Sequence, residues 1–137
     1  MAEASAELVA FARRLERARQ ERLRFFPAEL FGEPGWSLLL DLFVAHHEGR
    51  VVNTSGACFG ANVAQTTGLR WLEKLDAAGL IARHSHPQDT RFVMITLSPD
   101  GLKRMTAVLE SFHSRLANGH AYEPTLAQTN LGLQGSR

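Results

Sequence analysis

The sequence has little of several features that would place it in a specialised class. It holds a single cysteine, Cys58, so no disulfide can form within the chain, and a reducing compartment fits. The longest apolar stretch, residues 38–45, is interrupted by Asp41 and is far too short to span a bilayer. No apolar core of a secretion signal precedes the arginines that begin at Arg13. We therefore expect a cytoplasmic protein with no membrane partner.

A large net charge is also missing. The formal net charge is +1, which does not by itself indicate a protein that binds nucleic acid. The distribution is less even, because residues 13–24 hold six arginines against Glu16 and Glu21, a local excess of +4. A weakly charged protein can still bind DNA if its basic groups gather on one face.

Enzyme motifs are absent as well. The sequence shows no nucleophile elbow, no glycine-rich phosphate loop and no pair of carboxylates predicted to share a face. At 45% hydrophobic residues it has the composition of an ordinary globular protein with a modest core. We expect neither an enzyme nor a cofactor.

What the sequence does contain is helical periodicity. Apolar residues three and four apart predict a helix over residues 3–26, which Pro27 ends. Residues 36–47 are apolar on most sides, which predicts a deeply buried helix stopped by Gly49. A last helix is expected over residues 99–117, capped by Ser98.

Shorter elements are predicted between these helices. Val51 and Val52 allow a very short strand, and Thr54 or Ser55 can cap a short helix that reaches about residue 60. A longer helix follows over residues 65–78 and stops at Gly79. Two β segments, 80–83 and 91–97, are then joined as a hairpin by the polar loop 84–90.

This order predicts a mainly α fold with a small β-hairpin wing, a winged helix-turn-helix. The predicted division of the chain is as follows: an N-terminal dimerisation helix (1–31), the winged domain (32–98), a C-terminal dimerisation helix (99–118) and a flexible tail (119–137).

Three motifs in the second half of the chain resemble the multiple-antibiotic-resistance-regulator (MarR) family. They are Leu75 with 78–81 (Ala-Gly-Leu-Ile), 89–91 (Asp-Thr-Arg) and 97–101 (Leu-Ser-Pro-Asp-Gly). Residues 25–31 with Trp36 are similar to a subgroup of small winged-helix proteins from alphaproteobacteria. The resemblance implies a homodimeric, nucleoid-associated transcriptional regulator on a roughly palindromic DNA site. The family often binds small aromatic acids, but no residue here identifies an effector.

The helix over residues 65–78 would be the recognition helix, which enters the major groove. If its apolar positions face the core, then Gln65, Thr66, Leu69 and Arg70 face outward. Gln can pair with adenine, Arg with guanine, and Thr or Leu can touch a thymine methyl. Thr67 lies at the border, where it contacts either phosphate or the core. The plainer alternative is that all of these are solvated helix residues.

In the wing, the resemblance implies that Arg91 reaches the minor groove and that Asp89 orients it. The alternative is an ordinary surface ion pair, worth at most about 1 kcal/mol. Lys74 and Arg83 are either phosphate contacts or plain surface charges. Ala64 stands where a Ser or Thr cap would open the recognition helix, and an alanine there costs about 1 kcal/mol.

Other functions stay open at this point. His84 and His86 would lie on one side of a strand as half of a metal site, although no further ligands complete it and we expect no metal. Cys58 is either a redox sensor or a buried, inert thiol. A winged helix used only for protein contacts is the alternative to DNA binding.

Apolar seams on the two terminal helices favour a homodimer. The residues of the two seams are Leu8, Phe11, Leu15, Phe26, Leu102, Met105, Leu109, Phe112 and Leu116. We expect too little local sequence to cover them within one chain, and exposed seams of this size favour an interface. In the alternative, a terminal helix folds back over its own domain and the protein is a monomer.

Overall fold

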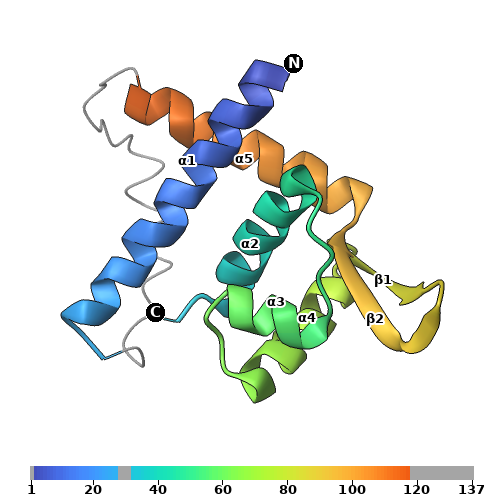
Figure 1. Ribbon diagram of the computed structural model, residues 1–137. Helices are drawn as coiled ribbons and strands as arrows, with labels where there is room; N and C mark the ends of the chain where they lie inside the picture. The colour runs from blue at the N-terminus through green and yellow to red at the C-terminus, as the bar shows by residue number, and fades with distance from the viewer. Residues whose placement is uncertain (1, 28–31, 118–137) are drawn as a thin grey trace.

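The structure is a computed structural model that describes residues 2–27 and 32–117. The predicted tail, 119–137, lies outside the described residues. The order of elements is α1 (Ala2–Glu21), the 3-10 turn η1 (Arg22–Arg24), α2 (Pro34–Glu48), α3 (Thr54–Gly60), α4 (Gln65–Ala77), β1 (Ile81–His86), β2 (Asp89–Leu97) and α5 (Pro99–Ala117). The predicted fold, mainly α with a β-hairpin wing, is confirmed (Figure 1).

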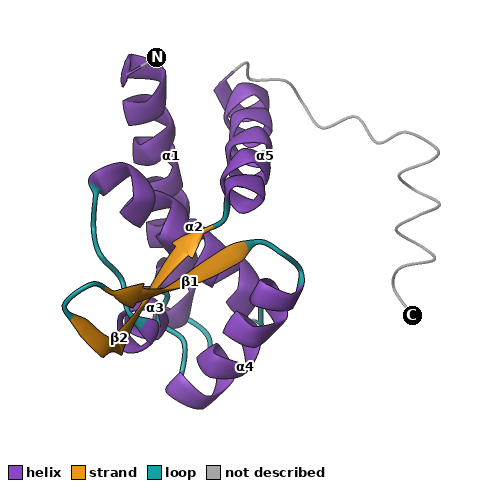
Figure 2. Cartoon of the chain, turned by 90° about the vertical axis from the view of Figure 1, so that its right-hand side faces the viewer, coloured by secondary structure: helices purple, strands orange, loops and turns teal. Residues whose placement is uncertain are grey.

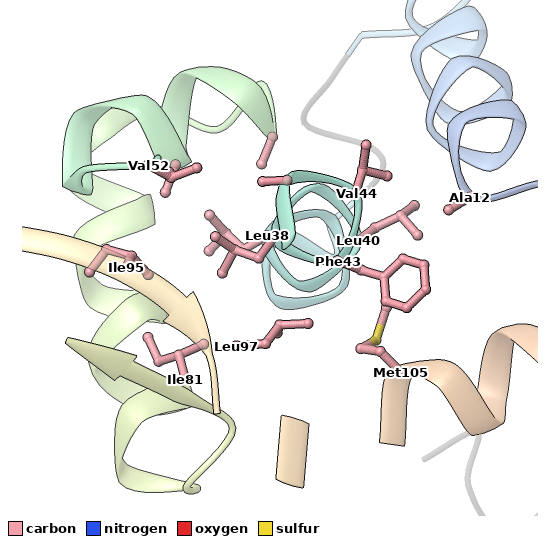
Figure 3. Close-up of a cluster of buried hydrophobic side chains, with 14 of the residues drawn as sticks. Ala12, Leu38, Leu40, Phe43, Val44, Val52, Ile81, Ile95, Leu97 and Met105 are labelled. Carbon is pink, nitrogen blue, oxygen red and sulfur yellow. The ribbon is translucent and has the colours of Figure 1, made fainter. Parts of the chain in front are cut away.

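Helix α2 lies at the centre of the core. Because it is apolar on most sides, it can pack against α1, α3, α4, α5 and β2 at once. Leu38, Leu40 and Phe43 are fully buried, and Figure 3 shows them surrounded by side chains from the hairpin and the terminal helices. The core is therefore a single one in which α2 joins the winged part to α1 and α5.

The helix boundaries follow the predicted stop and start signals. Gly49 takes the left-handed conformation at φ 70°, which glycine adopts without a steric penalty, and ends α2. Ser98 caps α5, because its Oγ accepts a hydrogen bond from the Gly101 N–H at 2.9 Å. A Cβ at Gly101 would overlap the carbonyl group of Leu80, so the turn from wing to α5 requires glycine there.

The predicted helix over residues 3–26 is too long. Helix α1 ends at Glu21, the chain tightens into η1, and Phe25 and Phe26 are exposed beyond it. Pro27 has no N–H to bond the carbonyl four residues before it, and its ring clashes with that carbonyl, so the turn before Pro27 cannot be α-helical. The Arg24 side chain also bonds back to Glu21 at 2.7 Å across the tightened turn.

The expectation that the terminal seams have no cover within one chain is wrong for most of their residues. Leu8, Phe11, Met105 and Leu109 are all buried in the single chain. Helix α2 is apolar on most sides, and α1 and α5 both pack on it and on each other. Phe112 and Leu116 stay exposed, at 40% and 68%.

The short strand predicted at Val51 and Val52 also differs from the prediction. Val52 is extended but forms no strand: its carbonyl accepts a hydrogen bond from the Ile95 N–H at 2.7 Å, and Asn53 makes an isolated bridge with Met94.

Within residues 2–27 and 32–117, no helix is long and apolar enough to cross a membrane.

Candidate nucleic-acid interface

The helix-turn-helix consists of α3, a four-residue connection and α4. Helix α3 is capped by Asn53, whose Oδ1 accepts a hydrogen bond from the Gly56 N–H at 2.7 Å. The predicted cap at Thr54 or Ser55 is therefore wrong by one or two residues. Asparagine caps a helix as well as serine does, so the sequence offered three adjacent capping residues with no means of choosing between them.

The turn between the helices depends on Asn62. Its φ of 57° places it in the left-handed region, which asparagine tolerates better than most residues. The Asn62 side chain also donates a hydrogen bond to Gln20 Oε1 at 2.9 Å, which ties the turn to α1. Sequence analysis did not identify Asn62, although an isolated asparagine between two helical patterns is a turn signal.

Gly68 explains how closely α3 and α4 cross. A Cβ at this position would overlap the Cys58 Sγ and lie 3.2 Å from the Cys58 Cβ. The glycine costs about 1 kcal/mol of helix propensity and in return admits the neighbouring helix. Cys58 is buried against this contact, and desolvation by burial raises the pKa of its thiol. These properties match a packing thiol and oppose thiolate reactivity.

The side of α4 that the sequence predicts to face outward is exposed in the structure. Gly68, Leu72 and Leu75 are buried, while Gln65, Thr66, Leu69 and Arg70 are exposed and Thr67 is half-buried. Ala64 stands at the N-cap and makes no side-chain cap hydrogen bond. The N-cap side chain therefore leaves the first N–H groups of α4 without a cap, at the positive end of the helix dipole.

Two neighbours of that face bear on its chemistry. Gln65 Nε2 lies 3.5 Å from the Ser55 Oγ, at the outer limit of a hydrogen bond, so the Gln65 amide stays available. Lys74 lies four residues after Arg70 on the same side of α4, with its Nζ 4.4 Å from the centre of the Trp71 ring. Arg83 instead forms an ion pair with Asp76 at 3.4 Å, which neutralises part of its charge.

The wing is longer than predicted. Strands β1 and β2 are antiparallel, with Ile81 opposite Leu97, and they reach His86 and Asp89, so only Pro87 and Gln88 connect them. Much of the predicted loop is thus strand. The polar sequence concealed it, because a two-stranded ribbon in solvent needs no apolar alternation.

The wing histidines have local neighbours. His84 Nε2 lies 3.0 Å from the Thr96 Oγ1, and the His86 ring meets Phe92 edge-on. In the described ranges of the chain, no group of three His, Cys, Asp or Glu side chains could hold a metal ion.

Arg91 lies near the tip of the wing and is 90% exposed. Its Nε donates to Asp89 Oδ1 at 3.2 Å, and its backbone N–H donates to the same oxygen at 3.1 Å. These hydrogen bonds, the side-chain one first, lower the pKa of Asp89. The carboxylate is therefore charged and fixes the base of the arginine side chain while the guanidinium stays in solvent.

The candidate residues lie on two elements. Those of α4 share one exposed side of a helix, and Asp89 and Arg91 are on the hairpin. Figure 2 shows α4 and the tip of the wing at one end of the molecule, with the free ends of α1 and α5 at the other. Sequence analysis located both elements, and it missed Asn53 and Asn62, which set the geometry of the turn between α3 and α4.

A short helix, a turn, a longer helix and a β-hairpin in this order define a winged-helix fold. Comparison of the sequence with models of protein families finds no match, and neither does comparison with curated proteins.

Solved structures do match. A probable transcriptional regulator from Pseudomonas aeruginosa is 24% identical, with a TM-score of 0.50 over 77% of this chain and 74% of that one. MepR from S. aureus, solved with ethidium bromide, is 18% identical, with a TM-score of 0.52 over 98% and 86%. BldR from Sulfolobus solfataricus, a transcriptional regulator, is 18% identical, with a TM-score of 0.50 over 73% and 70%. The MarR-like winged-helix fold expected from the sequence motifs is confirmed.

Proposed function

We propose that this protein is a non-enzymatic transcriptional regulator that binds double-stranded DNA at a specific sequence. The exposed side of α4 is the observation that carries the proposal. It presents an amide, a hydroxyl, an aliphatic side chain and a guanidinium within two turns, at the open N-terminal end of the helix. Each of these groups matches a feature of base edges in the major groove. The likeness in fold to transcriptional regulators agrees with the proposal.

In this proposal the residues have distinct roles. Gln65, Thr66, Leu69 and Arg70 read base edges. Thr67 and Lys74 contact phosphates, and Arg83 adds a weaker contact because Asp76 competes for it. Arg91, oriented by Asp89, enters the minor groove, where a narrow groove concentrates negative potential.

The proposed active form is a homodimer, as a palindromic site requires. Four of the nine seam residues are buried within one chain and two more are half-buried, so the apolar support for the dimer is limited to the exposed side chains of Phe26, Phe112 and Leu116. A two-fold dimer would place two α4 helices about 34 Å apart, one turn of DNA. Light scattering tests this part: a mass near 15.2 kDa would refute the dimer, and twice that mass would support it.

Selection from a random pool of duplex DNA tests the proposal as a whole. We expect the wild-type chain to enrich one motif with two half-sites about 10 base pairs apart. Binding should weaken steeply with salt, because phosphate contacts release counterions. A winged helix that serves only protein contacts would enrich no motif and would show no salt-dependent binding, and this result would overturn the proposal.

A further inference from the structure

Away from α4, the core contains a buried carboxyl group, that of Asp41. Asp41, on α2, is 5% exposed and is the one fully buried charged side chain among the described residues. Its Oδ1 lies 3.4 Å from the Arg50 Nη2, while its Oδ2 is buried with no hydrogen-bond donor among those residues. Gly60 packs directly against this carboxyl, where a Cβ would lie 3.0 Å from the Asp41 Cγ. A buried acceptor without a donor is costly.

A second carboxyl group, that of Glu16 on α1, reaches the first. Glu16 and Asp41 line the same cavity, but two ionised carboxylates can only accept hydrogen bonds, so neither can satisfy the other while both are charged. A hydrogen bond between them becomes possible when Glu16 is protonated, because its O–H can then donate to the Asp41 carboxylate. Burial first, and then the charge of Asp41, raise the pKa of Glu16 to about 7.

The surroundings favour a proton over any larger cation. A cavity of about 400 Å³ opens beside the pair, and Arg13, Arg17 and Arg50 line it. These arginines would repel a metal ion or an amine.

The other charged groups around the pair are accounted for. From α2, Glu48 binds both Arg13 and Arg50. Helix α3 and the turn after it contribute Phe59, Gly60 and Asn62 to the cavity, and none of these ionises. Helix α5 meets α1 through the His113 ring, which lies against Phe11.

We propose that Glu16 and Asp41 form a proton-operated latch, which holds α1 against α2 and the helix-turn-helix when Glu16 is protonated and weakens when Glu16 ionises. One turn along α1, Gln20 accepts a hydrogen bond from Asn62. A change in how α1 packs on α2 would therefore alter a contact of the turn that leads into α4. The latch is a property of the folded chain and does not depend on DNA binding.

The sign of the pH dependence follows from the direction of the shift. Glu16 has a higher pKa in the folded chain than the ordinary value of 4.5, so the folded state holds its proton more tightly than the unfolded state does. The stabilisation is complete below the ordinary pKa and is lost as the pH rises through about 7. One proton changes the unfolding equilibrium constant at most about tenfold per pH unit.

Urea unfolding of the full chain between about pH 5 and about pH 8 tests the latch. We compare the wild type with Glu16→Gln, which keeps a donor and cannot ionise, and with Glu7→Gln, an exposed control on the same helix. The wild type and Glu7→Gln should both lose stability as the pH rises, and Glu16→Gln should not share that loss. A Glu16→Gln profile parallel to the wild type would overturn the proposal.

A carbon NMR titration of the wild-type glutamate carboxyls makes the test independent of any variant. One glutamate, assigned to Glu16, should titrate near neutral pH. If every glutamate titrates near its ordinary pKa, the latch does not exist.

Discussion

The arginines of α1 and those at the winged end of the molecule are used in different ways. In α1, Arg13 binds Glu48, and Arg19 binds both Glu33 at 2.6 Å and Ser37 at 3.0 Å. At the other end, Arg91 is 90% exposed, and Arg70 has no ion-pair partner within the part of the chain that the structure describes.

This difference shows that density of charge in a sequence is a poor guide to a binding surface. Residues 13–24 carry a large local excess of positive charge, yet two of their arginines, Arg13 and Arg19, are paired with acids that come from α2 or lie just before it. Arg70 has no ion-pair partner among the described residues, and Arg91 pairs only with its own neighbour Asp89 while its side chain stays 90% exposed. A cluster of basic residues thus stabilises the fold when acidic residues of a neighbouring element form ion pairs with it.

The largest effect is expected where packing holds α4 in place. Gly68→Ala gains about 1 kcal/mol of helix propensity but drives a methyl group into Cys58. Overpacking typically costs about 1–3 kcal/mol and occasionally more. Because the methyl group would overlap the Cys58 Sγ outright, we expect a cost at or above the top of this range, and hence a net loss of stability in urea unfolding. Adding Cys58→Ala should restore part of the loss because it removes the Sγ. A Gly68→Ala variant as stable as the wild type would show that the two helices are not held by this contact.

Base contacts give the next effect. Arg70→Ala and Gln65→Ala should each weaken binding to the selected DNA site by about 1–3 kcal/mol, with the fold unchanged. Arg104→Ala is the matched control, because it removes an exposed arginine of α5 that pairs with Asp100. Binding is measured by gel-shift titration at one salt concentration. Equal affinities for Arg70→Ala and the control would end the assignment of α4 as the reading helix.

A smaller change is expected at the wing. Arg91→Ala should lower the affinity for specific and unrelated duplexes alike, since the minor groove carries a degenerate pattern of donors and acceptors. The preferred sequence should change less than in Arg70→Ala. Fluorescence anisotropy with both duplexes measures the ratio. An unchanged affinity at physiological salt would return Arg91 to the role of a surface ion pair.

The smallest effect is expected at Arg24. Its pair with Glu21 is exposed and three residues apart, an arrangement worth about 0.2–0.5 kcal/mol. Arg24→Ala should therefore change neither the unfolding midpoint nor the DNA affinity measurably. A clear loss of affinity would place the end of α1 on the DNA and would contradict the contrast between the two ends.

Periodicity predicted the elements of the fold well because it reports burial directly. The buried and exposed sides of α4 and the start of α5 at Ser98 followed from residue spacing and one capping residue. The wing strands were predicted too short because strand residues such as His84 and Thr90 are exposed to solvent, where no apolar pattern marks a strand.

The contacts of α1 could not be predicted from the sequence. No local pattern in the sequence predicts that α1 and α5 both pack against α2. None predicts that Glu16 and Asp41 line the same cavity. Such contacts depend on where two distant segments cross. The same holds for Gly68, whose conformational cost was visible in the sequence while its neighbour Cys58 was not.

The central claim, that α4 binds DNA while the α1 arginines hold the fold, is tested most directly by comparing Arg70→Ala with Arg19→Ala in one pair of assays. Each variant is titrated with the selected duplex and unfolded in urea. Arg70→Ala should lose DNA affinity and keep its stability. Arg19→Ala should lose about 1 kcal/mol of stability, since the pair is only partly screened, and keep its affinity. If Arg19→Ala weakens DNA binding as much as Arg70→Ala does, the account is contradicted.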